Sequence, residues 1–109
     1  MAQELSDETL NAIAQHFRVL SDPQRLRILH LLQGREMTVG ALAETTGHSQ
    51  PNVSKHLSIL RASGLVNRRR EGNCAYFSVA SPFVFDLCQT VCDGLRDEIE
   101  RRHAALANT

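Results

Sequence analysis

Two cysteines near the carboxyl end of the sequence have a spacing that suits the binding of a soft ion. Cys88 and Cys92 are four residues apart, so on a helix their Cβ atoms lie about 5–6 Å from each other on one face. Two thiolates placed in this way can hold a soft metal ion or an arsenic atom, because soft ligands select soft centres. A disulfide needs Cβ atoms at about 3.5–4.5 Å and would distort the helix.

Two other interpretations of these thiols stay open. The pair could undergo thiol redox or reactive-sulfur chemistry, or it could simply pack, because a free cysteine behaves as a small apolar side chain. Cys74 is the third cysteine, and about 20 Å of extended chain separates it from the start of the helix. Whether it joins the other two in one site is also left open. Three cysteines are an odd number and predict no disulfide framework.

Polar side chains gather at the start of another segment of helical periodicity. This segment begins at Ser49 and ends before Gly64, with Val53, Leu57 and Leu60 as its apolar stripe. When the stripe is buried, the solvent side near the N-terminal end is expected to carry Gln50, Asn52, Ser54, Lys55 and His56. Gln and Asn amides can bond bidentately to adenine, and Lys can reach guanine or phosphate. Helix N-terminal amides can add a phosphate contact.

An arginine-rich hairpin is expected directly after this helix. Residues 65–70 and 75–80 alternate as strands do, and Glu71-Gly72-Asn73 is the expected turn between them, because glycine and asparagine accept a positive φ. The guanidinium groups of residues 68–70 suit phosphates or a minor groove. Residues 49–85 carry five basic side chains and one acidic one, although the whole chain has 12 of each. This charge pattern predicts a localised anionic partner.

Turn and capping residues predict a small, mainly α-helical fold around these groups. The expected helices cover about 6–20, 23–33, 39–45, 49–63 and 82–107. Gly47 and His48 join the third helix to the fourth, as in a helix-turn-helix whose second helix lies in the major groove. The sequence therefore predicts one winged helix-turn-helix domain over residues 1–109, with five helices and a two-stranded wing. The helix-turn-helix would cover about 39–62 and the wing about 65–80.

The last helix carries more apolar surface than the small domain before it can cover. Its stripe consists of Cys88, Val91, Cys92, Leu95, Ile99 and Leu106. We therefore expect a homodimer through the helices at about 6–20 and 82–107, with two recognition helices about 34–36 Å apart, one turn of DNA. The alternative is that the last helix folds back on its own protomer.

Other classes of protein find little support in the sequence. No apolar segment approaches the ~20 residues that cross a bilayer, and no leader segment opens the chain, so we expect a cytoplasmic protein without a membrane partner. No Gly-rich phosphate loop and no set of nucleophile and base predicts an enzyme. A winged helix that binds protein instead of DNA is a remote alternative, and the basic segment argues against it.

Several sequence runs, in the right order, resemble the ArsR/SmtB family of winged-helix repressors. They are LSDPQRLRIL at 20–29, SQPNVSKHL at 49–57, LR at 60–61, GLV at 64–66, REG at 70–72 and AYFS at 75–78. The resemblance covers about residues 8–100. It implies a homodimeric repressor that binds a palindromic operator in double-stranded DNA and is released by a small inducer.

The resemblance also implies roles for individual residues. Bases would be read by Gln50, Ser54, Lys55 and His56, and the DNA backbone or minor groove would be contacted by Arg68, Arg70 and Asn73. With the start of the helix included, the candidate DNA-binding residues are Ser49, Gln50, Asn52, Ser54, Lys55, His56, Arg68, Arg70 and Asn73.

Two known inducer sites of that family do not match this sequence. Thr38 and Gly40 stand where the thiols of the arsenic-type site belong, and Ile99 and Arg102 stand where the second ligand pair of the zinc-type site belongs. The candidate inducer site is therefore Cys88 and Cys92, with Cys74 left open. The expected inducer is a soft metal or a metalloid such as As(III) or Sb(III). The alternative is a repressor of the same fold that senses thiol oxidation or reactive sulfur species.

Overall fold

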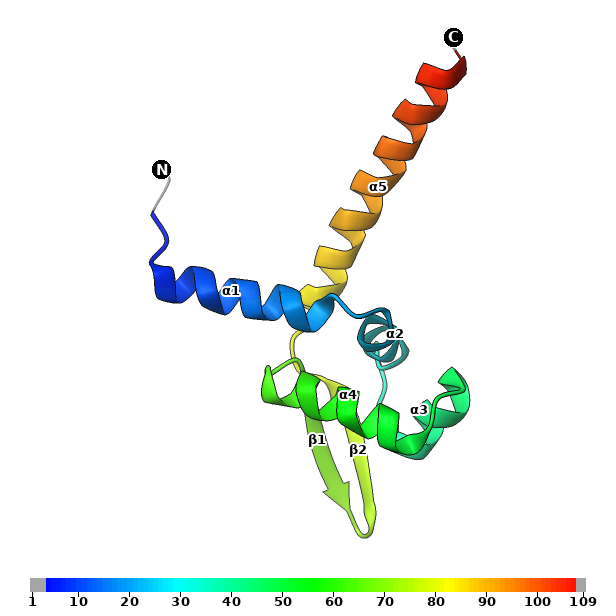
Figure 1. Cartoon of the computed structure of the whole chain (residues 1–109). Coiled ribbons are helices and arrows are strands. Elements are labelled where there is room, and N and C mark those ends of the chain that lie inside the picture. The colour runs from blue at the N-terminus through cyan, green and yellow to red at the C-terminus, as the bar shows by residue number, and fades with distance from the viewer. Residues whose placement is uncertain (1–3, 108–109) are drawn as a thin grey trace.

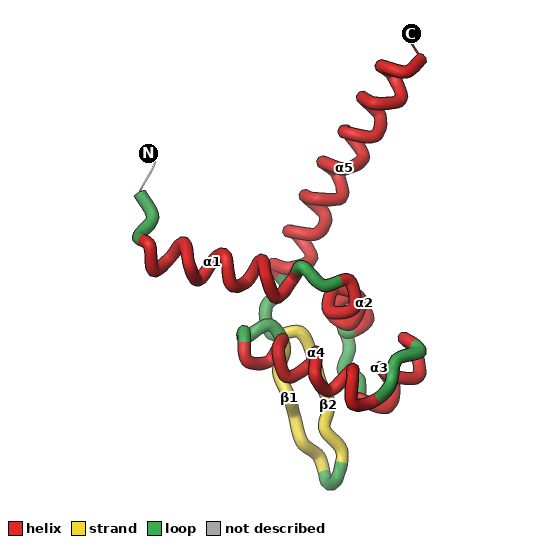
Figure 2. The backbone as a smooth tube through the Cα atoms, viewed as in Figure 1, coloured by secondary structure: helices red, strands yellow, loops and turns green. Residues whose placement is uncertain are grey.

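The computed structural model of the chain describes residues 4–107. Its helices are α1 (Asp7–Leu20), α2 (Pro23–Leu31), α3 (Val39–Thr46), α4 (Gln50–Ala62) and α5 (Phe83–Ala107), and its strands are β1 (Val66–Glu71) and β2 (Cys74–Val79) (Figure 1). The winged helix-turn-helix architecture expected from the sequence is confirmed. Figure 2 shows that the hairpin and α5 extend in opposite directions from the helical body in this view.

Side-chain caps fix the start of each of the first four helices. Ser6 accepts a hydrogen bond from the Thr9 amide, and Asp22, Thr38 and Ser49 cap α2, α3 and α4 in the same way. Such a cap contributes about 0.5–2 kcal/mol because it satisfies amides that the helix leaves unpaired. The four caps explain why the helices begin within a residue of their expected positions.

The end of the second helix and the bounds of both strands differ from expectation. The second helix ends at Leu31 instead of near residue 33: Leu32 is its C-cap, and Gly34 adopts a left-handed φ of 74°. The strands of the hairpin continue to Glu71 and Cys74, which pair across the turn. The hairpin is thus closed by a two-residue Gly72-Asn73 turn, and the six residue pairs of the wing lie one residue nearer to the turn than expected.

The core lies between α2, α3, α4 and the base of the hairpin. Its largest fully buried side chains are Ile28, Leu29, Leu32, Leu42, Val53, Leu57, Leu60, Leu65 and Val84. Burying one such side chain stabilises the fold by about 1.5–3 kcal/mol. Met37 and Phe77 exchange two backbone hydrogen bonds of 3.0 and 2.9 Å, which attach the wing to the segment before α3.

The register of the hairpin determines which arginines share a face. Arg68 pairs with Phe77 and Arg70 with Ala75, whereas Arg69 pairs with Tyr76. Because paired residues point to the same side of a sheet and neighbours along a strand point to opposite sides, Arg68 and Arg70 lie on the Phe77 side. Phe77 is buried and lines a groove together with Ser54 and Leu57 of α4, so this is the side that faces α4.

The helices α1 and α5 project from this core and leave apolar side chains uncovered (Figure 1). Val91, Leu95 and Ile99 of α5 are 53%, 59% and 53% exposed, and Phe17 of α1 is 55% exposed. The last helix therefore does not fold back on its own protomer. Despite its length, neither α5 nor any other helix within residues 4–107 is apolar enough to cross a membrane.

Candidate nucleic-acid interface

A three-residue connection turns the chain sharply from α3 into the candidate recognition helix α4. Gly47 has a left-handed φ of 77°, and its amide donates to the carbonyl oxygen of Ala43 at 2.9 Å. Ser49 then caps α4 by accepting from the Asn52 amide at 3.2 Å. A non-glycine residue at position 47 would be strained, so the glycine is what permits the short turn.

Most of the polar residues expected on the solvent side of α4 are found there. Ser49, Gln50, Ser54 and Lys55 are exposed, and Asn52 is half-buried. These side chains come from the N-cap and the first two turns of α4. The structure therefore leaves this end of α4 open to a partner.

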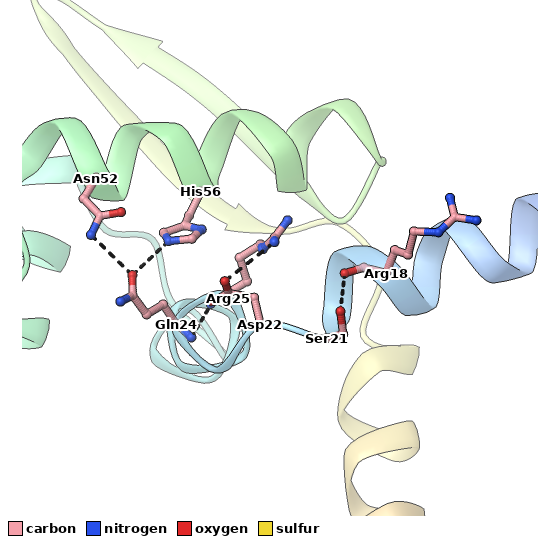
Figure 3. A network of polar contacts seen from close by, with 7 residues as sticks. All are labelled: Arg18, Ser21, Asp22, Gln24, Arg25, Asn52 and His56. Carbon is pink, nitrogen blue, oxygen red and sulfur yellow. Dashed lines mark hydrogen bonds and ion pairs between the residues drawn. The ribbon is translucent and has the colours of Figure 1, made fainter.

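The expectation that His56 faces solvent is wrong. Its side chain is 9% exposed, and Nε2 lies 2.8 Å from Oε1 of Gln24 on α2 (Figure 3). His56 follows Val53 by three residues and precedes Leu60 by four, so it shares the buried side of the helix. The helical spacing therefore predicts that His56 is buried, whereas its polar residue type favoured a position in solvent.

Gln24 holds two residues of α4 at once. Its Oε1 accepts from Nε2 of His56 and, at 3.4 Å, from Nδ2 of Asn52 (Figure 3). Asp22 fixes the end of α2 that carries Gln24 by accepting from the amides of Gln24 and Arg25 at 2.8 and 3.3 Å. The two helices are thus joined by a small polar network at the level where α4 exposes its candidate DNA-binding residues.

The charge state of His56 follows from its surroundings. Burial lowers the pKa of His56, Arg25, Lys55 and His48 act in the same direction, and the carboxylate of Asp22 opposes them. The ring is therefore neutral at pH 7, and its Nε2–H donates to Gln24. A neutral, buried ring bonded to α2 positions the recognition helix and does not reach a base.

Arg69 is bound to neighbouring acids on the other side of the wing. Its guanidinium donates to both carboxylate oxygens of Glu36 at 3.0 and 3.1 Å and to Glu71 at 2.7 Å, and it stacks 4.8 Å from the centre of the Tyr76 ring. The hydrogen bond from Arg69 lowers the pKa of the Glu36 carboxyl. Arg69 thereby ties the wing to the body of the domain, while Arg68 and Arg70 face the side of α4.

One basic residue near the wing was missed by sequence analysis. Arg61 lies in the last turn of α4, and its positive charge lowers the pKa of Arg68 on β1. Asn73 lies in the exposed turn at the wing tip. Cationic side chains from α4 and β1 therefore approach each other between helix and wing, and neither the helical nor the strand period alone reveals this.

The three cysteines do not meet in one protomer. Cys88 and Cys92 are half-buried on α5, whereas Cys74 is exposed at the start of β2, at the wing tip (Figure 1). The α5 pair lines an apolar groove of about 580 Å³ with residues of α1 and α2, among them Phe17, Leu26 and His30. In the described part of the chain, no three His, Cys, Asp or Glu side chains are placed to hold a metal ion.

Comparisons with known proteins agree with this architecture. Residues 22–68 match the family described as bacterial regulatory protein, arsR family. The nodulation protein NolR of Rhizobium meliloti is 38% identical over 93 residues, which cover 85% of this chain and 76% of NolR. A probable mercury resistance operon repressor of Streptomyces lividans is 45% identical over 74 residues, which cover 68% of this chain and 59% of that protein.

Solved structures show the same fold. The crystal structure of Rv0081 from Mycobacterium tuberculosis superposes with a TM-score of 0.77 at 34% identity and covers 89% of this chain and 98% of that one. The homodimeric winged helix-turn-helix DNA-binding domain of Mb0332 from Mycobacterium bovis has a TM-score of 0.72 at 35% identity. It covers 85% of this chain and 91% of that domain.

The names of the relatives also indicate whether the chain is a regulator or an enzyme. They are regulators and repressors by name, in agreement with the expectation that the chain is not an enzyme. The chain spans 64% and 66%, just under two thirds, of the first curated relatives that it matches. NolR is matched over more than two thirds of its length. On its motifs, its fold and this match, the chain belongs to the ArsR family of bacterial regulatory proteins.

Proposed function

We propose that this chain is a sequence-specific, DNA-binding transcriptional repressor that acts in the cytoplasm as a homodimer on a palindromic operator. The observation that carries the proposal is the exposed, polar start of α4 beside a wing whose Arg68 and Arg70 face the same side. A helix with this exposure fits a major groove, and flanking guanidinium groups fit the phosphates on either side.

The exposed residues divide by chemistry into two groups. Gln50 and Lys55 have the amide and ammonium groups that pair with adenine and guanine edges. Ser49, Arg70 and Asn73 suit contacts to the phosphate backbone, which set the position of a protein on the duplex. Asn52 is half-buried and bonded to Gln24, so we assign it to the support of α4 together with His56.

DNA binding is tested on a duplex that the full chain selects from a random-sequence pool. Lys55→Ala should weaken binding to the selected duplex far more than binding to an unrelated one. Arg70→Ala should weaken binding to both and reduce the slope of log affinity against log salt by about one phosphate contact. Arg96→Ala on α5, in the part of α5 that extends away from the wing, is the matched control and should change neither. Unchanged affinity in both test variants would refute the assignment of α4 and the wing.

The homodimer is proposed from the uncovered apolar side chains of α1 and α5. Leu10, Ile13 and Phe17 on α1 and Val91 and Leu95 on α5 are 40–59% exposed, and large contiguous apolar surfaces on a soluble domain mark an interface. A second copy is the proposed occupant, and the homodimeric Mb0332 domain supports it. Pairing two copies would place two α4 helices on one face of a duplex.

The test of the dimer is a charge placed on that surface. Leu95→Asp should shift the chain from dimer to monomer in sedimentation and weaken duplex binding, because each protomer would then bind a half-site alone. Thr90→Asp, also exposed on α5 but outside the stripe, should leave the dimer intact. A wild-type chain that sediments as a monomer at the concentrations at which it binds the duplex would contradict the proposal.

We further propose that the inducer acts at Cys88 and Cys92. The pair lines the apolar groove between α1, α2 and α5, next to the proposed dimer surface, and two thiols suit a soft metal or a metalloid such as arsenite or antimonite. The name of the Streptomyces lividans relative, probable mercury resistance operon repressor, favours this over thiol-redox or reactive-sulfur sensing, the second candidate. Release requires that the inducer bind the form that does not bind DNA more tightly.

A mobility-shift assay separates these inducers. Arsenite, antimonite, cadmium, mercury, a sulfide donor and peroxide are each added to the complex of the chain with its selected duplex. Cys88→Ser and Cys92→Ser should bind DNA normally and lose release, whereas Cys74→Ser is the control and should respond as the wild type. Release by metalloids or soft metals supports the first candidate, and release by sulfide or peroxide alone supports the second. Normal release of both α5 variants would show that the pair only packs.

A further inference from the structure

A groove of about 550 Å³ lies between the recognition helix α4 and the wing. Ser54, Ser58 and Arg61 of α4 and Arg68 of β1 line it with polar groups, and these four residues are exposed. Its accessible apolar floor is formed by Val39 and Ala75, which are half-buried, and by Ala62, which is exposed; Leu57 and Phe77 lie buried beneath them. The groove therefore combines cationic and hydroxyl groups with a surface of carbon atoms.

The secondary structure brings these side chains together. Residues 54, 58 and 61 follow one another at helical spacings of four and three, so they share one side of α4. Arg68 lies on the side of the hairpin that carries Phe77, and that side faces α4. The polar residues of the groove are thus presented by two elements that the fold holds against each other.

The groove has a net positive charge that the chain does not neutralise. Among the ion pairs formed within residues 4–107, none involves Arg61 or Arg68. In contrast, Arg69 on the opposite side of the wing pairs with two carboxylates. Arg61 lowers the pKa of Arg68, as expected where two like charges lie close together. An anion between them would relieve this repulsion.

We propose that this groove binds one phosphodiester of the DNA backbone, with Arg61 and Arg68 donating to the same phosphate. The hydroxyls of Ser54 and Ser58 donate to its remaining oxygens, and the adjoining deoxyribose packs on the apolar floor. The inference rests on the proposed DNA-binding function and deepens it. It adds Arg61 and Ser58 to the interface and moves Ser54 from base reading to backbone binding.

The occupant follows from the position and chemistry of the groove. It lies where the backbone must pass if α4 enters the major groove and the wing follows the adjacent groove. A sugar-phosphate unit presents an anionic group and a carbon surface side by side, as the groove requires. A free phosphate would use the arginines and leave the floor uncovered.

The test neutralises one phosphate at a time. Duplexes of the sequence that the full chain selects are prepared with a single methylphosphonate at successive positions, which removes the charge of one phosphate. At one position in each half-site, neutralisation should weaken wild-type binding by about ten-fold or more, the effect of losing charge-assisted hydrogen bonds. Arg61→Gln and Arg68→Gln each weaken the contact to this phosphate. Neutralising the same phosphate should therefore reduce the duplex affinity of either variant much less than it reduces that of the wild type.

One control variant and two further test variants complete the experiment. Arg96→Gln on α5 should show the wild-type pattern, and Ser58→Ala should show a smaller loss of sensitivity at the same position. The double variant Arg61→Gln/Arg68→Gln should lose less affinity than the product of the single losses, because the two side chains share a ligand. Circular dichroism shows that each exposed substitution leaves the fold intact.

The outcomes separate this inference from the function on which it rests. If the two arginine variants lose sensitivity at different phosphates, or retain the wild-type pattern, the shared phosphate site is wrong although the chain binds DNA. If the wild-type chain binds no duplex in a salt-dependent way, the proposed function itself is wrong. Binding of inorganic phosphate alone, with no effect of methylphosphonates, would also overturn the backbone assignment.

Discussion

Removal of the side-chain amide of Gln24 tests whether the network in Figure 3 holds the recognition helix in place. The variant Gln24→Met keeps the length of the side chain and its helix propensity, and it removes the oxygen that accepts from His56 and Asn52. The backbone N–H of residue 24 is unaffected by the substitution and still donates to the Asp22 carboxylate. The substitution is therefore specific for the link between α2 and α4.

The expected cost follows from burial. His56 is 9% exposed, so its Nε2–H would be left buried without an acceptor, which costs about 1–3 kcal/mol. Asn52 is half-buried and its bond is long at 3.4 Å, so its amide can turn to water at little cost. We expect a loss of about 1–3 kcal/mol, and each kcal/mol lowers the Tm of a domain of this size by about 4–8 °C.

Thermal unfolding at one fixed protein concentration measures this loss, because a dimer has a concentration-dependent Tm. Gln33→Met, at an exposed position, is the matched control and should change the Tm little. In the background His56→Phe no buried donor remains, so Gln24→Met should there be nearly neutral. The reasoning is refuted if Gln24→Met costs no more than Gln33→Met, or costs the same with and without His56.

Three other perturbations have defined outcomes. Because burial lowers the pKa of His56, the unfolded chain binds more protons as the pH falls below about 6.5. Stability should therefore decline from that pH downwards more steeply in the wild type than in His56→Phe, and parallel curves would contradict this. Gly47→Ala should cost about 1–2 kcal/mol through its left-handed φ alone, since nothing lies within 4 Å of an added Cβ. Gly47→Asn should lose less, and equal losses would point to another cause. Leu29→Ala, at a fully buried side chain, should cost about 2–5 kcal/mol in denaturant unfolding, and a loss near zero would mean that the core is misplaced.

The elements of this fold are predictable because local signals mark their ends. Asp22 and Ser49 are capping residues directly before a proline-containing first turn, and Gly47 and Gly64 follow the last turns of two helices with left-handed φ angles. Such signals act within a few residues of the chain. The strand ends at the turn depend on pairing between strands, and there the expected strands stopped one residue short of Glu71 and Cys74.

Side-chain partners were less predictable because they depend on distant parts of the chain. Arg69 lies between two arginines of the same strand, and its partner Glu36 is 33 residues away. The bond between His56 and Gln24 spans 32 residues. Residue type favoured solvent exposure for His56, whereas helical spacing favoured burial, and the structure follows the spacing. Arg61 was not selected because its relation to Arg68 arises when the wing folds against α4.

The element α2 links the two regions to which function is assigned. Gln24 at its first turn holds α4, while Leu26 and His30 line the groove that contains Cys88 and Cys92. His30 also packs edge-on against Phe85 of α5, with ring centroids 5.3 Å apart. A ligand that draws the two thiols together would displace side chains packed on α2, and the α2–α4 bond would carry the displacement to the recognition helix. Gln24→Met should then not only weaken duplex binding but also reduce the factor by which the inducer weakens it. An unchanged factor would show that the signal reaches α4 by another route, through the dimer contact of α1 and α5.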